Sequence, residues 1–348
     1  MTFAFPGCFE KDILKNREGE HSKDFLITHF QGRSNEKLFP LGKDLPRAAV
    51  VSIGEMSVKT AHMLLPLMAA AGIRVFIKSN HERDKENLLD LNSIFRFLSS
   101  SGPSGVLFDI RIGGASPLKS IQETTVLLLS LEEICEILKI SSCSVLSSQH
   151  QPLGKAFGSP YAVLEILDFL NGRGPFDVNK LVLELGTNIM RLVGASSDRN
   201  AAKKHLKAKI MRGSALDSYK KYIIAHKGNA RFFDDNSLLL AGKKKRRVRS
   251  MKKGYIIRIS LERLFKNRAL KISLSSLGLL FLKQTGDRIK IGDVLGEIAA
   301  PQPYDTSALL RAFNESIDFS DSPPLFSPFL LETSGILRRS SGLEEIKC

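Results

Sequence analysis

A strand–helix–strand pattern in residues 48–77 constrains the fold of this chain more than any other feature. Ala48 to Ile53 is a short apolar run, typical of a buried strand. Ser57 to Ala71 then carries apolar residues at helical spacing and closes at Gly72, a natural helix stop. Ile73 to Ile77 is a second short apolar run. Such a βαβ unit predicts a parallel sheet with right-handed crossovers.

The pattern is repeated further along the chain. Val106 to Ile112 is expected to be a strand, Ile121 to Leu138 a helix, and Cys143 to Leu146 a strand. We also expect helices over 10–31, 163–170, Val178 to Val193 and Asn200 to Met211, and strands over Gly254 to Ile259 and Leu277 to Leu282. Residues 285–298, TGDRIKIGDVLGEI, carry two Gly-Asp turns between alternating residues, which predicts a hairpin. The fold class is therefore α/β, with a smaller C-terminal α+β unit that contains a hairpin.

The composition indicates a soluble, cytoplasmic protein. Hydrophobic residues make up 43% of the 348 residues, but no stretch reaches the roughly 18–20 apolar residues of a membrane helix, so no membrane partner is expected. The start of the chain lacks the pattern of a secretory signal. The four cysteines form no C-x-x-C pair and the histidines form no ligand cluster, so we expect neither disulfides nor a metal site.

The chain is strongly basic, with a net charge of +15, and part of the excess lies in one run. Residues 243–253 read KKKRRVRSMKK, with eight positive charges. We expect a solvated linker, because like charges repel one another and keep such a run mobile. Nuclear targeting and RNA contact stay open as alternatives. The run contains no aromatic residue on which bases could stack, so nucleic acid is not the expected partner.

The turn after the first predicted strand, within VVSIGEMSVKT, is the first candidate binding site. It contains Ser52 and Gly54, and Ser57 and Lys59 follow at the start of the predicted helix. Small residues, hydroxyls and a lysine at such a turn would suit a phosphate, because backbone N–H groups point at ligands there. Serine and glycine are also ordinary turn and N-cap residues, which is the alternative interpretation.

Residues 151–186, QPLGKAFGSPYAVLEILDFLNGRGPFDVNKLVLELG, closely resemble the thymidine and pyrimidine-nucleoside phosphorylase family. Members carry a Q-P-L-G turn, which here is Gln151, Pro152, Leu153 and Gly154. The segment 107–119, LFDIRIGGASPLK, is similar to a strand and turn of the family, and it keeps Asp109, Gly113 and Lys119. Similar stretches elsewhere extend the resemblance over most of the chain. The chain therefore looks like a diverged, internally shortened member of this family.

The resemblance implies a pentosyltransferase of pyrimidine-nucleoside salvage. Family members are homodimers in which a small helical domain faces a larger α/β domain. Inorganic phosphate, the co-substrate, attacks the anomeric carbon of the nucleoside and releases the base, and no cofactor is needed. The domains expected here are 1–47 with 155–195 as a shortened helical dimerisation domain, 48–154 with 196–242 as the phosphate- and nucleoside-binding domain, 243–253 as the basic linker, 254–335 as the C-terminal domain and 336–348 as a tail.

Several ligand-binding motifs of the family are altered. In its phosphate turn, Val50 and Val51 stand where the family has lysine and histidine. The residues that the resemblance still offers to a phosphate are Ser52, Gly54 and Ser79, with Lys59, Lys78 or Lys85 as substitutes for the lost charge. A pyrimidine-binding segment expected after Phe97 is missing. No catalytic residue is assigned.

Three hypotheses follow. The chain is a nucleoside phosphorylase that splits pyrimidine nucleosides with phosphate, or an inactive member that acts as a scaffold or a weak nucleoside or phosphate binder, or a basic nucleic-acid-binding protein.

Overall fold

The structure is a computed structural model that describes residues 45–53, 58–79, 91–113, 116, 118, 120–148, 151–225, 228–266, 276–324, 329–339 and 342–347. The helix expected over 10–31 and the candidate residues Gly54, Lys85 and Lys119 lie outside this described part.

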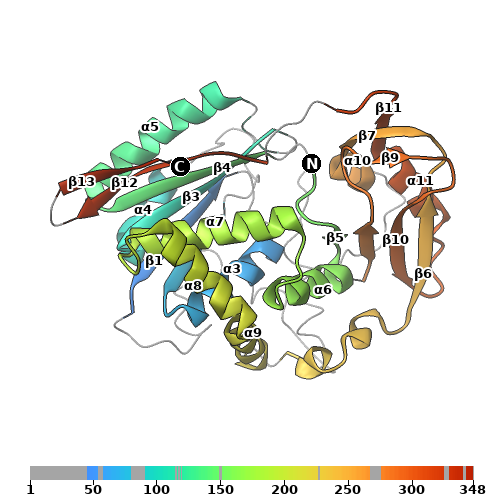
Figure 1. Ribbon diagram of the computed structural model, residues 1–348, viewed down its shortest axis with the longest axis horizontal. Coiled ribbons are helices and arrows are strands. Elements are labelled where there is room, and N and C mark those ends of the chain that lie inside the picture. Colours follow the sequence, from blue (N-terminus) through green and yellow to red (C-terminus); the bar gives the residue numbers. More distant parts are fainter. Residues whose placement is uncertain are drawn as a thin grey trace.

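A six-stranded sheet forms the centre of the larger unit, with the strand order β13-β12-β4-β3-β1-β2 (Figure 1). Strands β1 to β4 are parallel, and β12 joins β4 in the antiparallel sense. The elements of this part are β1 (Arg47–Ile53), α3 (Val58–Ala70), β2 (Arg74–Ser79), α4 (Leu91–Ser101), β3 (Gly105–Ile112), α5 (Ile121–Leu138), β4 (Ser141–Ser148), β12 (Leu330–Arg339) and β13 (Gly342–Lys347). The predicted βαβ units and the mainly parallel sheet are confirmed.

Local capping explains where two of the helices begin. Helix α5 starts after Ser120, whose hydroxyl accepts a hydrogen bond from the Glu123 N–H. Helix α8 (Arg199–Met211) starts after Asp198, whose carboxylate accepts from the Ala201 N–H at 2.6 Å. Each cap satisfies an N–H group that has no partner inside the helix.

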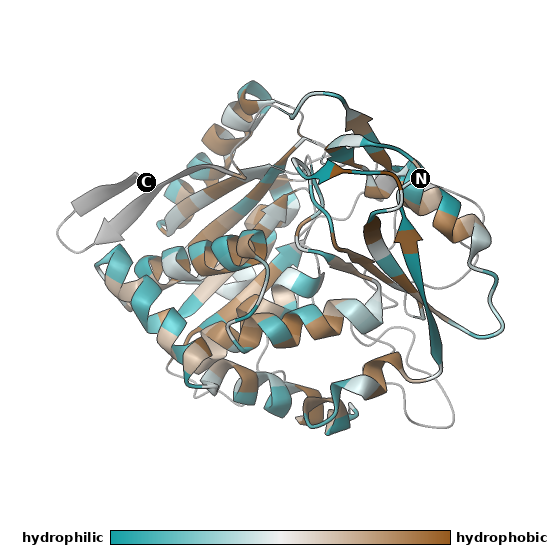
Figure 2. Cartoon of the chain, turned by 45° about the vertical axis from the view of Figure 1, so that its right-hand side comes forward, coloured by the Kyte–Doolittle hydropathy of each residue, from teal (hydrophilic) through white to brown (hydrophobic). Residues whose placement is uncertain are grey.

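Helices cover both faces of the parallel strands, because these strands are apolar on both sides (Figure 2). Side chains alternate between the faces along each strand. On one face, Val51 and Phe108 pack with the buried residues of α4 and α5. On the other face, Val50 and Leu107 join the core formed by α3 and the helices α6 (Ser159–Leu170), α7 (Phe176–Leu192), α8 and α9 (Ser214–Ala225).

The described helices of segment 155–195 do not stand apart from the sheet. Helix α7 contacts β3 and β4, and the buried residues of α6 and α7 belong to the same core as α3. The structure therefore differs here from the expected division, in which 155–195 belongs to a separate helical domain. Two 3-10 helices, η2 (Ala230–Phe233) and η3 (Asn236–Leu240), then lead toward the C-terminal unit.

The C-terminal unit contains two small sheets around a core of its own. The first sheet has the order β5-β8-β10-β6, and the second has the order β11-β7-β9. The elements are β5 (Ala156–Phe157), β6 (Lys243–Arg249), β7 (Gly254–Ile259), α10 (Leu261–Lys266), β8 (Gly278–Phe281), β9 (Arg288–Ile289), β10 (Val294–Pro301), α11 (Ser307–Glu315) and β11 (Ile317–Ser320).

Three expectations for the last third of the chain differ from the structure. The basic run is not a linker, because Lys243 to Arg249 form strand β6, which pairs with β10. The two strands of segment 285–298 do not pair with each other, because β9 pairs with β7 while β10 pairs with β6 and β8. The end of the chain is not a tail, because β12 and β13 extend the main sheet.

A polar contact joins α6 to the C-terminal unit. The Tyr161 hydroxyl donates a hydrogen bond to the Glu297 carboxylate of β10, and the Lys245 ammonium lies 3.9 Å from the same carboxylate. Burial raises the pKa of the Tyr161 phenol, and the bond to Glu297 raises it further. The phenol therefore stays protonated and keeps donating throughout the neutral range.

Candidate functional site

A buried polar cluster lies toward the carboxyl ends of β1 and β3. Ser52 and Asp109 are register partners on these neighbouring strands, and the Ser52 hydroxyl donates to Asp109 Oδ2 at 3.2 Å. Arg111, two residues further along β3, lies on the same face and places a guanidinium nitrogen 3.5 Å from the same oxygen. All three side chains are buried. The Ser52 hydroxyl is thus already engaged inside the protein.

Some polar atoms of this cluster have no hydrogen-bond partner among the described residues. They are Asp109 Oδ1, Arg111 Nε and the hydroxyl of Ser147, the register partner of Arg111 on β4. Ser147 was not singled out from the sequence. The signal was present in the run SSCSVLSS, where serines interrupt a strand. A buried ionic pair needs further hydrogen bonds to offset the free energy of its desolvation. Because several atoms of this cluster lack such bonds, the cluster lowers the stability of the folded protein.

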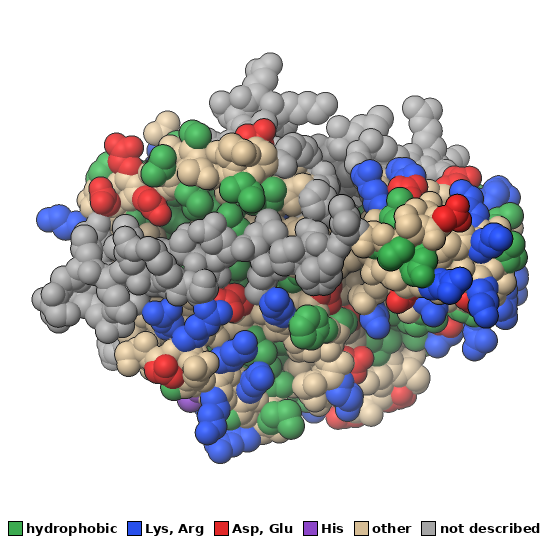
Figure 3. Space-filling view, turned by 45° about the horizontal axis from the view of Figure 1, so that its top comes forward, with side chains coloured by type: hydrophobic (Ala, Val, Ile, Leu, Met, Phe, Trp, Pro, Cys, Tyr) green, Lys and Arg blue, Asp and Glu red, His purple; other side chains and the backbone are tan. Residues whose placement is uncertain are grey.

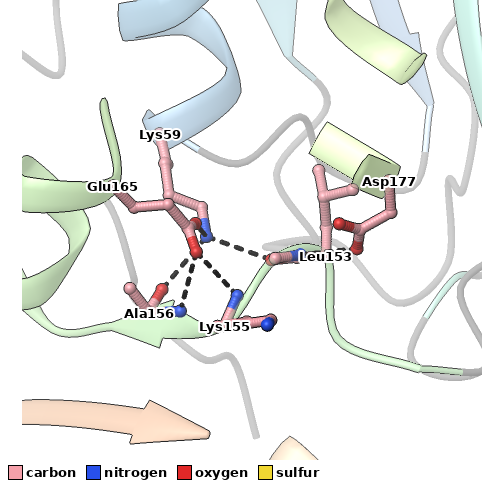
Figure 4. Close-up of polar contacts among 7 residues, drawn as sticks. Lys59, Leu153, Lys155, Ala156, Glu165 and Asp177 are labelled. Atoms are coloured by element: carbon pink, nitrogen blue, oxygen red, sulfur yellow. Dashed lines mark hydrogen bonds and ion pairs between the residues drawn. The ribbon is translucent and has the colours of Figure 1, made fainter. Parts of the chain in front are cut away.

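Lys59 lies at the start of α3, and its ammonium is enclosed by oxygen atoms (Figure 4). It donates to the backbone carbonyls of Leu153 and Ala156, each at 3.0 Å, and it forms an ion pair with the Glu165 carboxylate of α6. The lysine and glutamate side chains are only 7% and 6% exposed. An ammonium has three protons, and the three acceptors account for all of them. In this arrangement Lys59 has no proton left for a phosphate.

The turn Gln151 to Gly154 is held by the same network. Glu165 accepts hydrogen bonds from the N–H groups of Lys155 and Ala156, at 2.7 and 3.1 Å. Asp177, in the first turn of α7, accepts from the Gly154 N–H at 2.8 Å. The turn therefore fixes the relative positions of α3, α6 and α7.

Gly154 is required at this position for two reasons. Its φ angle is +71°, in the left-handed region that disfavours residues with a Cβ atom. A Cβ atom here would collide with the Glu165 carboxylate and lie 2.8 Å from Lys59 Nζ.

The other residues offered by the sequence are placed as follows. Ser79, at the end of β2, is the register partner of Ser52, so two hydroxyl-bearing residues stand side by side on neighbouring strands. Val50 and Val51 are fully buried in the two cores on either side of the sheet. Gly113 has a φ angle of +82° and donates its N–H to the Leu118 carbonyl at 2.8 Å.

Neither metal ligands nor membrane helices are found in the described ranges. No group of three or more His, Cys, Asp or Glu side chains is arranged there to hold a metal ion. Among the described helices, none combines the length and apolar character that crossing a membrane requires.

The chain is similar in sequence to proteins of known name. The pyrimidine-nucleoside phosphorylase of Geobacillus stearothermophilus is 29% identical over 213 residues, which cover 59% of this chain and 49% of that protein. The enzyme of the same name from Staphylococcus haemolyticus (strain JCSC1435) is 25% identical over 254 residues, covering 69% of this chain and 58% of that protein. This chain is a diverged relative of the pyrimidine-nucleoside phosphorylases. It spans about half the length of these curated relatives, 49% to 58%.

No protein-family model matches the chain. Among solved structures, anthranilate phosphoribosyltransferase (TrpD) from Thermus thermophilus is similar over 54% of this chain and 80% of that chain, at 8% identity. The TM-score of this similarity is 0.34.

Proposed function

We propose that this chain is a non-catalytic relative of the nucleoside phosphorylases, which retains the α/β fold as a scaffold and does not carry out phosphorolysis. The observation that carries the proposal is the enclosure of Lys59 by Leu153, Ala156 and Glu165. Within residues 50–60, which hold the predicted phosphate turn and the start of the following helix, Lys59 is the one lysine or arginine in the sequence. Its protons and the Ser52 hydroxyl are both engaged inside the protein.

Relative to an enzyme that keeps the family's phosphate contacts, this chain is expected to have a much lower rate of phosphorolysis. Charge-assisted contacts to a phosphate contribute about 1.5–3 kcal/mol each. At the positions where the resemblance calls for lysine and histidine, the chain has buried Val50 and Val51. Losing two such contacts removes about 3–6 kcal/mol of transition-state stabilisation, which corresponds to roughly a 10²- to 10⁴-fold lower rate. Following the resemblance, the scaffold would be a cytoplasmic homodimer, with at most weak binding of pyrimidine nucleoside and phosphate.

An assay of base release tests the proposal. The purified full chain is incubated with thymidine or uridine and inorganic phosphate, and free base is measured by chromatography. The pyrimidine-nucleoside phosphorylase of Geobacillus stearothermophilus at equal concentration is the positive control. We expect no base release above that of a protein-free blank, and a dimeric mass by analytical ultracentrifugation.

Phosphorolysis is the second candidate, and one observation favours it. Ser52 and Ser79 are register partners near the carboxyl ends of β1 and β2, so both could face the same ligand. Base release above the blank that disappears in the double variant Ser52→Ala and Ser79→Ala would establish this function and refute the non-catalytic proposal.

A further inference from the structure

Strand β6 concentrates positive charge on an ordered edge of the C-terminal unit. Six of its seven residues are lysine or arginine, and it is the last strand in the order β5-β8-β10-β6. Val248 is buried, whereas Lys244, Lys245, Arg246, Arg247 and Arg249 are exposed. Pairing with β10 fixes the backbone, so these charges occupy defined positions and are not spread along a mobile linker.

The charges form two rows on opposite faces of the strand. Side chains alternate, so Lys244 and Arg246 share the face of Val248, while Lys245, Arg247 and Arg249 point to the other face. Within each row, neighbouring charges are about 6.8 Å apart along the strand.

Nearby acidic groups leave most of this charge uncompensated. Glu297 lies 3.9 Å from Lys245 but also accepts the Tyr161 hydroxyl. The backbone N–H of Ser307 lowers the pKa of the exposed Asp305, and the charge of Arg246 makes a small further contribution to that shift. The side chains of Lys244, Arg246 and Arg247 make no hydrogen bond or ion pair with the described residues.

Further cations extend the basic surface beyond the strand. Lys252 and Lys253 are exposed directly after β6. The turn that carries exposed Lys290 lies beside them, because the Gly292 N–H donates to the Ser250 carbonyl at 2.8 Å. Lysine and arginine side chains gather on the right-hand side of Figure 3, over the C-terminal unit.

We propose that this edge of the C-terminal unit binds the phosphate backbone of a double-stranded nucleic acid. Two rows of cations on opposite faces of one strand fit a partner with phosphates on both sides of a groove, whereas a membrane surface would meet one row. The run has no aromatic side chain for base stacking, so binding is to the backbone and independent of sequence. An ordered strand also loses less conformational entropy on binding than a linker would.

Salt-dependent binding tests the proposal. The full chain is titrated into fluorescein-labelled DNA and RNA duplexes of arbitrary sequence, and anisotropy is followed at several salt concentrations. Each neutralised phosphate contributes about −0.9 to the slope of log K against log[salt]. For five contacts we expect a slope of roughly −4.5 with at least one of the two duplexes. The triple variant Lys244→Gln, Arg246→Gln and Arg247→Gln should make the slope less steep by roughly 2.7.

The control variant Lys204→Gln, Lys207→Gln and Lys221→Gln removes the same number of charges from exposed positions of α8 and α9. It should keep the parental slope, because those lysines lie outside the proposed surface. The single variant Arg247→Gln, expected to change the slope by roughly 0.9, provides the same readout should the triple variant fail to fold. A parental slope near zero for both duplexes, an equal loss in the control, or tighter binding to phosphatidylserine vesicles than to either duplex would overturn the proposal.

Discussion

Replacing Lys59 by methionine should destabilise the protein by about 3–5 kcal/mol, the range for breaking a buried ion pair by removing one partner. Methionine keeps most of the apolar stem, so the change mainly removes the charge. The Glu165 carboxylate, 6% exposed, would then remain buried with two backbone N–H donors and no cation. The carbonyls of Leu153 and Ala156 would also lose their shared donor.

A double-mutant cycle measures the interaction energy between Lys59 and Glu165. Glu165→Gln alone should also be costly, because it leaves the Lys59 ammonium buried without its carboxylate. The double variant Lys59→Met with Glu165→Gln should cost less than the sum of the single variants, by about 0.5–3 kcal/mol, since neither charge is then left unpaired. The free energy of unfolding is measured by urea titration followed by circular dichroism.

Lys220→Met is the matched control, because the partly exposed Lys220 makes a 3.5 Å ion pair with the exposed Asp234. It should cost no more than about 1 kcal/mol, the usual limit for a surface pair. If Lys59→Met costs as little as this control, or if the two single costs simply add, the buried network does not hold the turn as described.

Three other predictions follow from the described contacts. Gly154→Ala should destabilise the protein by more than the roughly 1–2 kcal/mol of left-handed backbone strain, because the new methyl also meets Glu165 and Lys59. Urea unfolding measures this cost, and a value within or below about 1–2 kcal/mol would contradict the clash. Arg199→Ala should cost about 1.5–3 kcal/mol, because Arg199 donates at 2.7 Å to the buried Glu184 carboxylate; a thermal melt unchanged from the parent would argue against this. The pKa of Asp305 is held below its usual 3.8, first by the Ser307 N–H and then by the Ser307 hydroxyl. Its stabilising contribution is therefore present above pH 3.8 and is lost as the pH falls through the lower folded-state pKa. In an NMR titration, Ser307→Ala should raise that pKa partway toward 3.8, and no change would exclude a role for the hydroxyl.

The sequence predicted best those helices and strands in which apolar residues follow one clear pattern. The helix over Ile121 to Leu138 has the predicted bounds, and the strands around Ala48 to Ile53 and Val106 to Ile112 differ from the prediction by one residue at one end. Strand β6 was missed because its single buried residue, Val248, leaves no apolar alternation in a run of charges. An edge strand gains its order from backbone pairing with β10, and a pattern of side chains does not report that pairing.

The candidate site was harder to predict because its contacts are distant in sequence. Lys59 follows the predicted phosphate turn, and nothing nearby indicates that its partner is Glu165, 106 residues away. Ser52 and Asp109 are 57 residues apart, and they meet only because β1 and β3 pair in that register. The spacing of the motifs identified these segments, but it could not predict which side chains of the folded protein Lys59 and Ser52 contact.

The two roles considered for Lys59 exclude each other on energetic grounds. To bind a phosphate, its ammonium would have to leave Glu165, which breaks a buried pair at a cost of about 3–5 kcal/mol. A new charge-assisted contact to phosphate would return only about 1.5–3 kcal/mol. The structural contact with Glu165 therefore prevails over a single contact to phosphate. Anion binding by this chain is consequently better served by the exposed cations of β6, whose neutralisation by a partner breaks little existing structure.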